Sequence, residues 1–182
     1  GCTSAGEIGP SGYHGYSLTG ASFPRSVCSA VTGVLTELTT FGLTSGHPLV
    51  QQMLQQLEVR NAHAGENNSF AILLVDGLSR REELVAHVLQ NLLGRIPLIG
   101  GSAGGGLQFR QPYVYFDGRF RPDSACLIII STPLAFLPFK TQHFLATDER
   151  LVVTAAEPSR RRVIEINGLP ADEEYARVVG CT

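Results

Sequence analysis

A short apolar strand that runs into a cluster of glycines constrains this chain more than any other feature. Pro97-Leu98-Ile99 leads directly into Gly100-Gly101-Ser102-Ala103-Gly104-Gly105-Gly106. Glycine has no Cβ, so it adopts positive φ at low cost and lets backbone N–H groups face inward. The stretch therefore predicts either a tight chain crossing or a stretch of backbone that borders a ligand.

The start of the chain repeats this feature. Ser4-Ala5-Gly6 has the same three residues as Ser102-Ala103-Gly104, and we call the two the first and second Ser-Ala-Gly segments. An aromatic stretch and then an apolar run follow each of them, at 12–16 and 18–23 after the first and at 113–116 and 125–130 after the second. We interpret this as two related halves, each with a strand, a Ser-Ala-Gly turn and a hairpin. Because the chain begins inside the first motif, we expect the first elements of that half to be missing.

The remaining pattern predicts hairpin-linked strands with few helices. Three helices are expected. The first begins after Ser45 as a cap and has an apolar stripe of Leu49, Val50, Met53, Leu54 and Leu57. The second runs from the Ser79/Glu82 capping box to Gly94, and the third from Pro170 to Gly180. Strands are expected at 18–23 paired with 27–35, and at 70–75, 125–130, 136–144, 151–155 and 163–166, with turns at Asp117-Gly118 and Asn167-Gly168. The fold class is therefore α+β, with mixed, largely antiparallel sheets and flanking helices.

Composition and charge argue against several classes of protein. The 182 residues are 43% apolar and 16% charged, and the formal net charge is −2, so the chain can bury a core and has no strongly basic surface for nucleic acid. The longest apolar run, 125–130, is far shorter than the ~20 residues that span a bilayer, so we expect no membrane contact. Four scattered cysteines form no CxxC pair, which favours buried, reduced thiols in a cytoplasmic protein over a zinc site or a disulfide framework. They are Cys2, Cys28, Cys126 and Cys181.

The second Ser-Ala-Gly segment also fits the G-x-S-x-G pattern of a nucleophile elbow. An elbow serine requires a helix immediately after it, whereas Gly105, Gly106 and Pro112 oppose helix formation. Local spacing places no histidine or aspartate beside Ser102. A phosphate-binding loop would also require a helix after it and usually a lysine, and Lys140 is the only lysine in the chain. We therefore expect no enzymatic activity, with a hydrolase that uses Ser102 as the alternative.

The two Ser-Ala-Gly segments are instead structural turns or the wall of a small-ligand pocket. In the second interpretation, the ligand contacts come from both segments, from the glycine before the second and from one nearby tyrosine. These residues are Ser4, Ala5, Gly6, Gly101, Ser102, Ala103, Gly104 and Tyr113.

The five histidines have no spacing typical of a metal site, so no metal is expected. His47, His63 and His87 occupy ordinary solvated positions on helix ends, loops and helix flanks. His143 differs, because it lies between Gln142 and Phe144 in an expected strand with a buried face. It is either a hydrogen-bonded core residue or an axial ligand of haem.

The motifs taken together resemble the FIST domain. Those that carry the resemblance, in order along the chain, are Gly1-Cys2-Thr3-Ser4-Ala5-Gly6-Glu7-Ile8, Leu73-Leu74-Val75-Asp76-Gly77-Leu78, Pro97 to Gly104, Phe116-Asp117-Gly118-Arg119 and Glu165-Ile166-Asn167-Gly168-Leu169-Pro170-Ala171. The resemblance implies a bacterial sensory domain of a signal-transduction protein that binds a small ligand such as an amino acid. It divides the chain into an amino-terminal FIST domain at 1–168 and the start of the companion carboxy-terminal domain at 169–182.

Some relatives in this family bind haem, sense nitric oxide and act on a histidine kinase. Thr141-Gln142-His143-Phe144 stands where many relatives have a His-Gly-Trp-like segment, so the resemblance implies haem as a possible cofactor, with His143 as its ligand. A third interpretation is a scaffold module that binds no small molecule. If a ligand lies between the two FIST domains, this chain holds only half of its site.

Overall fold

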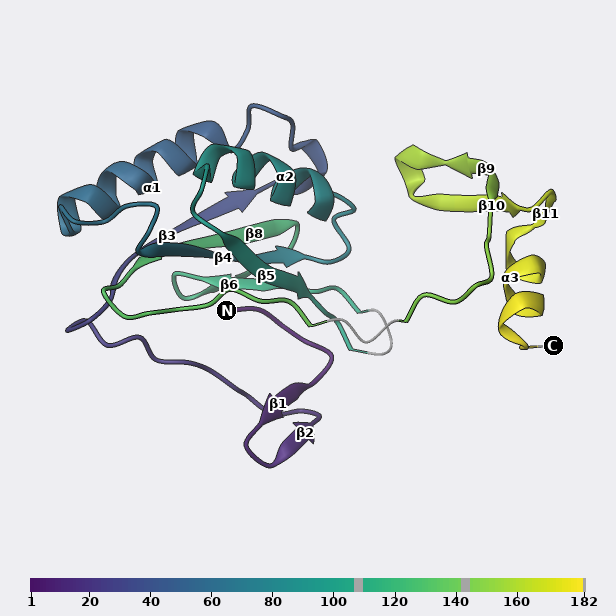
Figure 1. Cartoon of the computed structure of the whole chain (residues 1–182), viewed down its shortest axis with the longest axis horizontal. Helices are drawn as coiled ribbons and strands as arrows, with labels where there is room; N and C mark the ends of the chain where they lie inside the picture. Colours follow the sequence, from purple (N-terminus) through teal and green to yellow (C-terminus); the bar gives the residue numbers. More distant parts are fainter. Residues whose placement is uncertain (107–109, 142–144, 182) are drawn as a thin grey trace. The chain divides into compact units, whose positions relative to one another are not determined.

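The computed structural model describes residues 1–106, 110–141 and 145–181 (Figure 1). The chain forms two compact units, Gly1–Lys140 and Thr141–Thr182. The first unit contains, in chain order, β1 (Glu7–Gly9), β2 (Gly12–His14), β3 (Ser29–Thr36), a 3-10 turn (Leu38–Thr40), α1 (His47–Arg60), β4 (Ser69–Asp76), α2 (Glu82–Leu93), β5 (Leu98–Ala103), β6 (Val114–Phe116), β7 (Arg119–Arg121) and β8 (Ser124–Ser131). The second contains β9 (Val153–Glu157), a 3-10 turn (Pro158–Arg160), β10 (Arg162–Ile166), β11 (Leu169–Pro170) and α3 (Ala171–Val179).

The first unit is built on a four-stranded sheet in the order β3-β8-β4-β5. β8 is antiparallel to both of its neighbours, and β5 is parallel to β4, which places the carboxyl ends of β4 and β5 at the same edge. The smaller sheets among the described residues are antiparallel. The predicted α+β class with mixed, largely antiparallel sheets is confirmed.

Both helices of this unit cover one face of the sheet (Figure 1). Alternate residues of β4, Ala71, Leu73 and Val75, point toward them and are buried, as the period of a strand requires. Helix α1 lies so close to β3 that a Cβ on Gly33 would meet the side chains of Leu49 and Met53 at 2.7 Å. Gly33 therefore sets the depth at which α1 packs on the sheet.

The predicted helices form, but two predicted caps do not. Ser45 Oγ accepts a hydrogen bond from the Gly42 N–H at 2.9 Å, and α1 begins after Gly46. Ser79 likewise accepts from the Arg81 N–H at 3.2 Å and donates to the Asp76 carbonyl oxygen at 2.8 Å. Both hydroxyls stabilise the preceding turn instead of the helix end, because serine competes for nearby backbone groups in non-helical conformations.

The chain pairs differently from the prediction before β3. Residues 18–23 form no strand, and Leu18 is 97% exposed. β3 pairs instead with β8, from Ser29↔Ser131 to Thr36↔Ser124. The run at 18–23 has too few large apolar residues to bury a face, so the longer and more apolar β8 takes its place as the partner.

Each Ser-Ala-Gly segment is followed by a hairpin, as the repeat predicts. The first is followed by β1 and β2, and the second by β6 and β7. Asp117 and Gly118 both have positive φ, 48° and 74°, which confirms the two-residue turn. The halves differ beyond the hairpins, because 18–23 has no strand to match β8.

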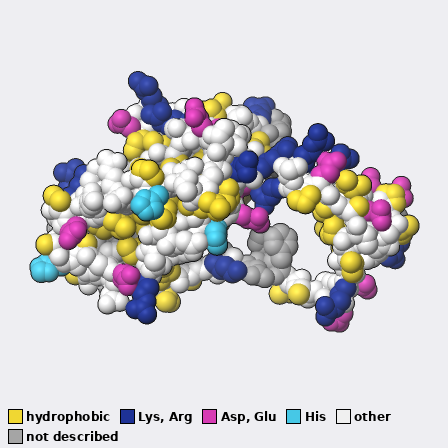
Figure 2. All heavy atoms as spheres, turned by 90° about the horizontal axis from the view of Figure 1, so that it is seen from above, with side chains coloured by type: hydrophobic (Ala, Val, Ile, Leu, Met, Phe, Trp, Pro, Cys, Tyr) yellow, Lys and Arg dark blue, Asp and Glu magenta, His cyan; other side chains and the backbone are white. Residues whose placement is uncertain are grey.

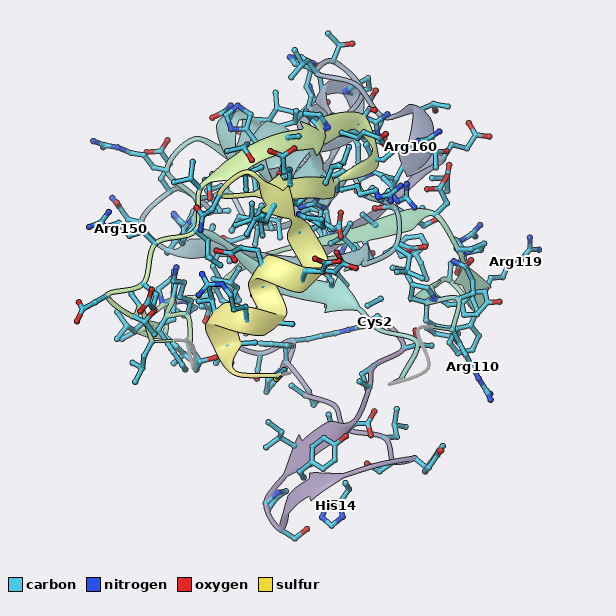
Figure 3. All side chains as sticks on the ribbon, turned by 90° about the vertical axis from the view of Figure 1, so that its right-hand side faces the viewer. Cys2, His14, Arg110, Arg119, Arg150 and Arg160 are labelled. Carbon is cyan, nitrogen blue, oxygen red and sulfur yellow. The ribbon has the colours of Figure 1, made fainter. Side chains whose placement is uncertain are left out.

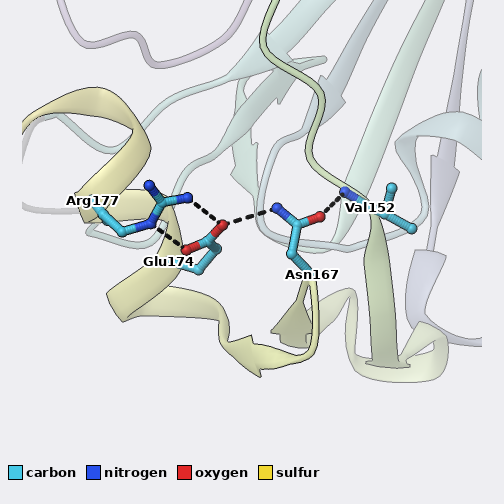
Figure 4. A network of polar contacts seen from close by, with 4 residues as sticks. All are labelled: Val152, Asn167, Glu174 and Arg177. Carbon is cyan, nitrogen blue, oxygen red and sulfur yellow. Dashed lines mark hydrogen bonds and ion pairs between the residues drawn. The ribbon is translucent and has the colours of Figure 1, made fainter.

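The second unit is a three-stranded antiparallel sheet, β11-β10-β9, with α3 (Figure 4). The turn at Asn167-Gly168 and the end of α3 at Gly180 are confirmed, and α3 begins one residue after Pro170. Glu174 is 2% exposed and is held by Arg177 at 2.7 Å and by the Asn167 amide at 2.9 Å. Asn167 also accepts from the Val152 N–H at 3.0 Å, so one network ties the turn to α3 and to the chain that enters β9.

The strand predicted at 136–144 does not form over its described residues, 136–141. Phe136 instead packs on Phe70 of β4, with ring centroids 4.9 Å apart. Prolines at 133 and 138 interrupt backbone pairing on both sides of this contact, which explains the irregular chain. Residues 142–144 lie outside the described residues.

Candidate functional site

The two Ser-Ala-Gly segments lie next to each other in the first unit. Residues 1–3 run antiparallel to 113–115, with Cys2 opposite Val114. The Thr3 N–H donates to the Tyr113 carbonyl oxygen at 2.9 Å, and the Thr3 carbonyl oxygen accepts from the Gly104 N–H at 3.0 Å. Thr3 therefore connects the end of β5 to β6 and brings the first segment to the second.

The second segment begins inside β5 rather than in a turn. Ser102 and Ala103 are the last two residues of the strand, in register with Val75 and Asp76 of β4. Ser102 is exposed, whereas Ala103 is buried in a small apolar cluster with Val114 of β6. The prediction of a turn over this segment is thus wrong for Ser102 and Ala103, which lie in the strand, and the chain leaves the sheet at Gly104.

Hydrogen bonds from the β1 and β2 hairpin hold the first segment. The Ser4 hydroxyl donates to the Glu7 carboxylate, and the Tyr13 hydroxyl donates to the Ala5 carbonyl oxygen at 3.1 Å. A Cβ on Gly6 would overlap the Tyr13 ring, so glycine is required for this contact. Hydrogen bonds from Ser4 and then Ser17 hold the pKa of Glu7 below its usual value.

The glycines of the second segment serve different purposes. Gly100 has φ of 151°, and a Cβ there would overlap the Leu73 carbonyl oxygen of β4. A Cβ on Gly104 would lie 3.3 Å from the Ala5 nitrogen, which is close but leaves some room. A Cβ on Gly101 would meet nothing within 4 Å. Packing therefore explains Gly100, whereas Gly101 presents bare backbone to the exterior.

A buried carboxylate that the sequence did not single out organises this edge of the sheet. Asp76, the last residue of β4, is 1% exposed. Its Oδ1 accepts from the Leu78 N–H at 2.8 Å, and its Oδ2 accepts from the Asp123 N–H at 2.7 Å and from Gln111 Nε2 at 3.3 Å. The only available signal was an aspartate directly after the strand expected at 70–75, which also fits an ordinary turn.

Tyr113 is half-buried beside the first segment. Its backbone N–H donates to Thr3 Oγ1 at 2.9 Å. Its ring meets Phe120 edge-on with centroids 6.4 Å apart, and Phe120 also contacts Tyr115 at 5.0 Å. The eight predicted contact residues come from three places along the chain, 4–6, 101–104 and 113, and the backbone hydrogen bonds of Thr3 to Gly104 and Tyr113 join these places.

The geometry around Ser102 differs from a nucleophile elbow. Ser102 lies in an extended strand, and no helix follows within the described residues up to 141. Among the residues that the structure describes, no histidine or carboxylate makes a hydrogen bond to the Ser102 hydroxyl. The arrangement is that of a strand end rather than of an activated serine.

The described histidines are all exposed, and Figure 2 shows histidine side chains on the surface of the molecule. They are His14, His47, His63 and His87. No group of three metal-ligating side chains was found among the described residues, and His143 lies outside them. All four cysteines are free, and of these only Cys126 is buried, which raises the pKa of its thiol.

Comparison with known proteins gives one match. The FIST N domain family model matches residues 1–169. No curated protein and no solved structure has significant similarity to the chain. Among the described residues, no helix has both the length and the apolar character that crossing a bilayer requires.

Proposed function

The chain belongs to the FIST N domain family, whose members are sensory domains of signal-transduction proteins, and we propose that it detects a small molecule bound where its two Ser-Ala-Gly segments meet. One observation carries this proposal, the hydrogen bond between Gly104 and Thr3 that joins the segments at 3.0 Å. The junction lies at the carboxyl edge of the parallel strands β4 and β5, and ligands of α/β sheets bind at that edge.

The groups exposed at this junction suit a small polar ligand. Ser102 offers a hydroxyl, the Ser4 hydroxyl oxygen can accept a hydrogen bond while its hydrogen is donated to Glu7, and the absence of a side chain at Gly101 leaves open space on the strand beside Ser102. The half-buried Tyr113 ring supplies an apolar wall. An amino acid, with its ammonium, carboxylate and side chain, has complementary chemistry.

Two further parts of the proposal are that the sensory domain covers 1–168, with 169–182 opening the companion domain, and that the protein acts in the cytoplasm.

Thermal shift and calorimetry with a panel of amino acids test the site. A ligand at 100 times its Kd stabilises a protein by about 2.7 kcal/mol, so the melting temperature rises by several degrees. In Gly101→Val the added side chain fills the open space beside Ser102, and the shift is lost. Gly65→Ala is the matched control, because its Cβ also meets nothing within 4 Å but lies in the loop before β4. A shift that Gly101→Val leaves intact would falsify the site.

A haem-based nitric oxide sensor that acts on a histidine kinase is the finer form of this proposal. It is supported by the segment Thr141-Gln142-His143-Phe144 and by membership of the family. Bound haem would supply the nitric oxide ligation, and this chain would supply the imidazole of His143. The test is a Soret band in haem-reconstituted protein that His143→Ala removes and that His63→Ala, at an exposed loop position, retains.

The same preparations distinguish the two other functions. Labelling of wild-type protein, but not of Ser102→Ala, by a fluorophosphonate probe would indicate a serine hydrolase. A protein that carries no small molecule in native mass spectrometry and that no panel member stabilises would be a scaffold module.

A further inference from the structure

Strand β7 has one unpaired edge. Within the described residues, it pairs only with β6, in the register Phe116↔Arg119, Tyr115↔Phe120 and Val114↔Arg121. In a hairpin with a two-residue turn, the residues that flank the turn form a hydrogen-bonded pair and the next pair does not. The N–H and carbonyl groups of Phe120 therefore point away from β6, and no described residue outside the hairpin binds them.

Side chains of opposite character alternate along this edge. Phe120 is 63% exposed and lies on the same face as Tyr115, which is 42% exposed. Arg119 and Arg121 lie on the other face, on the side of the buried Val114. Figure 3 shows Arg119 extending away from the ribbon. An apolar ring is thus flanked by two cations that point the opposite way.

Neither arginine has its charge matched within the part of the chain that the structure describes. Arg119 makes no ion pair there, and Arg121 has a buried Nε without a hydrogen-bond partner. The only acidic residue between 113 and 121 is Asp117, in the turn. Two guanidinium groups without an acidic partner among the described residues attract an incoming carboxylate, which forms charge-assisted hydrogen bonds with their accessible nitrogens.

We propose that β7 binds a peptide segment of a protein partner as an added strand, in which two acidic residues flank an apolar one. Strand addition uses the free Phe120 backbone groups for affinity and alternate side chains for specificity. The acidic residues lie beside Arg119 and Arg121 on one face, and the apolar residue lies beside Phe120 on the other. A single strand of nucleic acid fits less well, because base stacking and phosphate contacts would fall on opposite faces of β7.

The first test uses two fluorescent peptides of equal composition, with capped ends. Thr-Glu-Val-Glu-Thr has the alternating pattern, and Thr-Val-Glu-Glu-Thr places one carboxylate on the wrong face. Fluorescence anisotropy with the whole chain should show binding of the alternating peptide that weakens with salt and is at least about tenfold tighter than that of the control. Hydrogen exchange of the Phe120 amide should slow in the complex. No binding at about 1 mM peptide, or an unchanged Phe120 amide, overturns the proposal.

The second test exchanges charges. Arg119→Glu should weaken the glutamate peptide at least about tenfold. A peptide with one lysine and one glutamate, Thr-Lys-Val-Glu-Thr or Thr-Glu-Val-Lys-Thr, should bind this variant more tightly, because its lysine lies beside the introduced carboxylate and its glutamate beside Arg121. Arg95→Glu is the matched control, because Arg95 is an exposed arginine in the turn between α2 and β5. Binding that Arg119→Glu leaves unchanged contradicts the inference, as does a single-stranded oligonucleotide that displaces the peptide. The variants that test the small-molecule site, Gly101→Val and Gly65→Ala, leave β7 unchanged, so failure of one proposal is distinguishable from failure of the other.

Discussion

The carbonyl oxygen of Thr3 accepts a hydrogen bond from the N–H of Gly104 at 3.0 Å, and this contact joins the two copies of the Ser-Ala-Gly repeat. Backbone groups make the contact, so it does not depend on a particular side chain at either position. What it requires is close approach of two segments of the chain, and small residues in both segments permit that approach. The repeat of small residues along the sequence therefore corresponds to an actual crossing in space.

The Thr3 side chain adds to this crossing, which leads to a prediction. Its Oγ1 accepts from the Tyr113 N–H at 2.9 Å. Thr3→Val keeps the shape but leaves this N–H without its acceptor, at a cost of about 1 kcal/mol. Exchange of the Tyr113 amide should become about fivefold faster. Thr3→Ser keeps the oxygen and should exchange as the wild type does. Acceleration in Thr3→Ser but not in Thr3→Val would show that the methyl group, rather than the hydroxyl, matters.

Two adjacent glycines of β5 should respond very differently to alanine. Gly100→Ala meets the Leu73 backbone and an unfavourable φ of 151°, so we expect a loss of about 3 kcal/mol or more. Gly101→Ala meets nothing within 4 Å and should change stability by less than about 1 kcal/mol. Urea unfolding of the two variants measures the difference. Similar midpoints would mean that β4 and β5 are not so closely paired at Gly100.

Asp76 should tolerate no change of its carboxylate. In Asp76→Asn, one amide N–H₂ group must face a backbone N–H donor, either that of Asp123 or that of Leu78. Because the site is buried, we expect a loss of about 3 kcal/mol in the free energy of unfolding. Asp117→Asn is the control, since asparagine adopts the positive φ of that turn readily and should be neutral within about 0.5 kcal/mol. An Asp76→Asn variant as stable as the control contradicts this role.

The elements that could be predicted from sequence are those with strong local signals. The stripe at Val50, Met53 and Leu57, the continuous run of β4 and the Asp117-Gly118 turn each fix their structure within a few residues. The strand predicted at 18–23 failed because pairing is decided by the competing partner, β8, which lies far away in the sequence. Local pattern reports which segments can form strands, and burial in the whole sheet decides which ones do.

The candidate site divides in the same way. The repeat indicated both Ser-Ala-Gly segments, and the structure brings them together, but no local pattern could indicate Asp76, whose partners Gln111 and Asp123 come from distant parts of the chain. The unpaired edge of β7 could not be predicted from the sequence either, because it depends on which other strands lie beside β7. Three-dimensional neighbours, rather than residue types, separate an ordinary turn aspartate from a central hydrogen-bond acceptor.

The Glu174 network in the second unit makes stability depend on acid pH. Hydrogen bonds from Arg177 and then from Asn167 lower the pKa of Glu174 from its usual value of 4.5 to about 2. A carboxyl group with a lower pKa in the folded state stabilises that state at pH values above 4.5, and this contribution is lost as the pH falls through about 2. In that range α3 should loosen from the Asn167 turn.

NMR titration of the Glu174 carboxyl carbon measures this pKa directly, and the amide shifts of α3 report the loosening. Glu174→Gln removes the titrating group, so its α3 shifts should not follow the pH between about 4.5 and 2. The matched control is Glu173→Gln, since Glu173 is the exposed neighbour on the same helix and its removal should leave the transition in place. A Glu174 that titrates near 4.5 in the folded protein would mean that Arg177 and Asn167 do not hold it, because a carboxylate that accepts these hydrogen bonds must be harder to protonate.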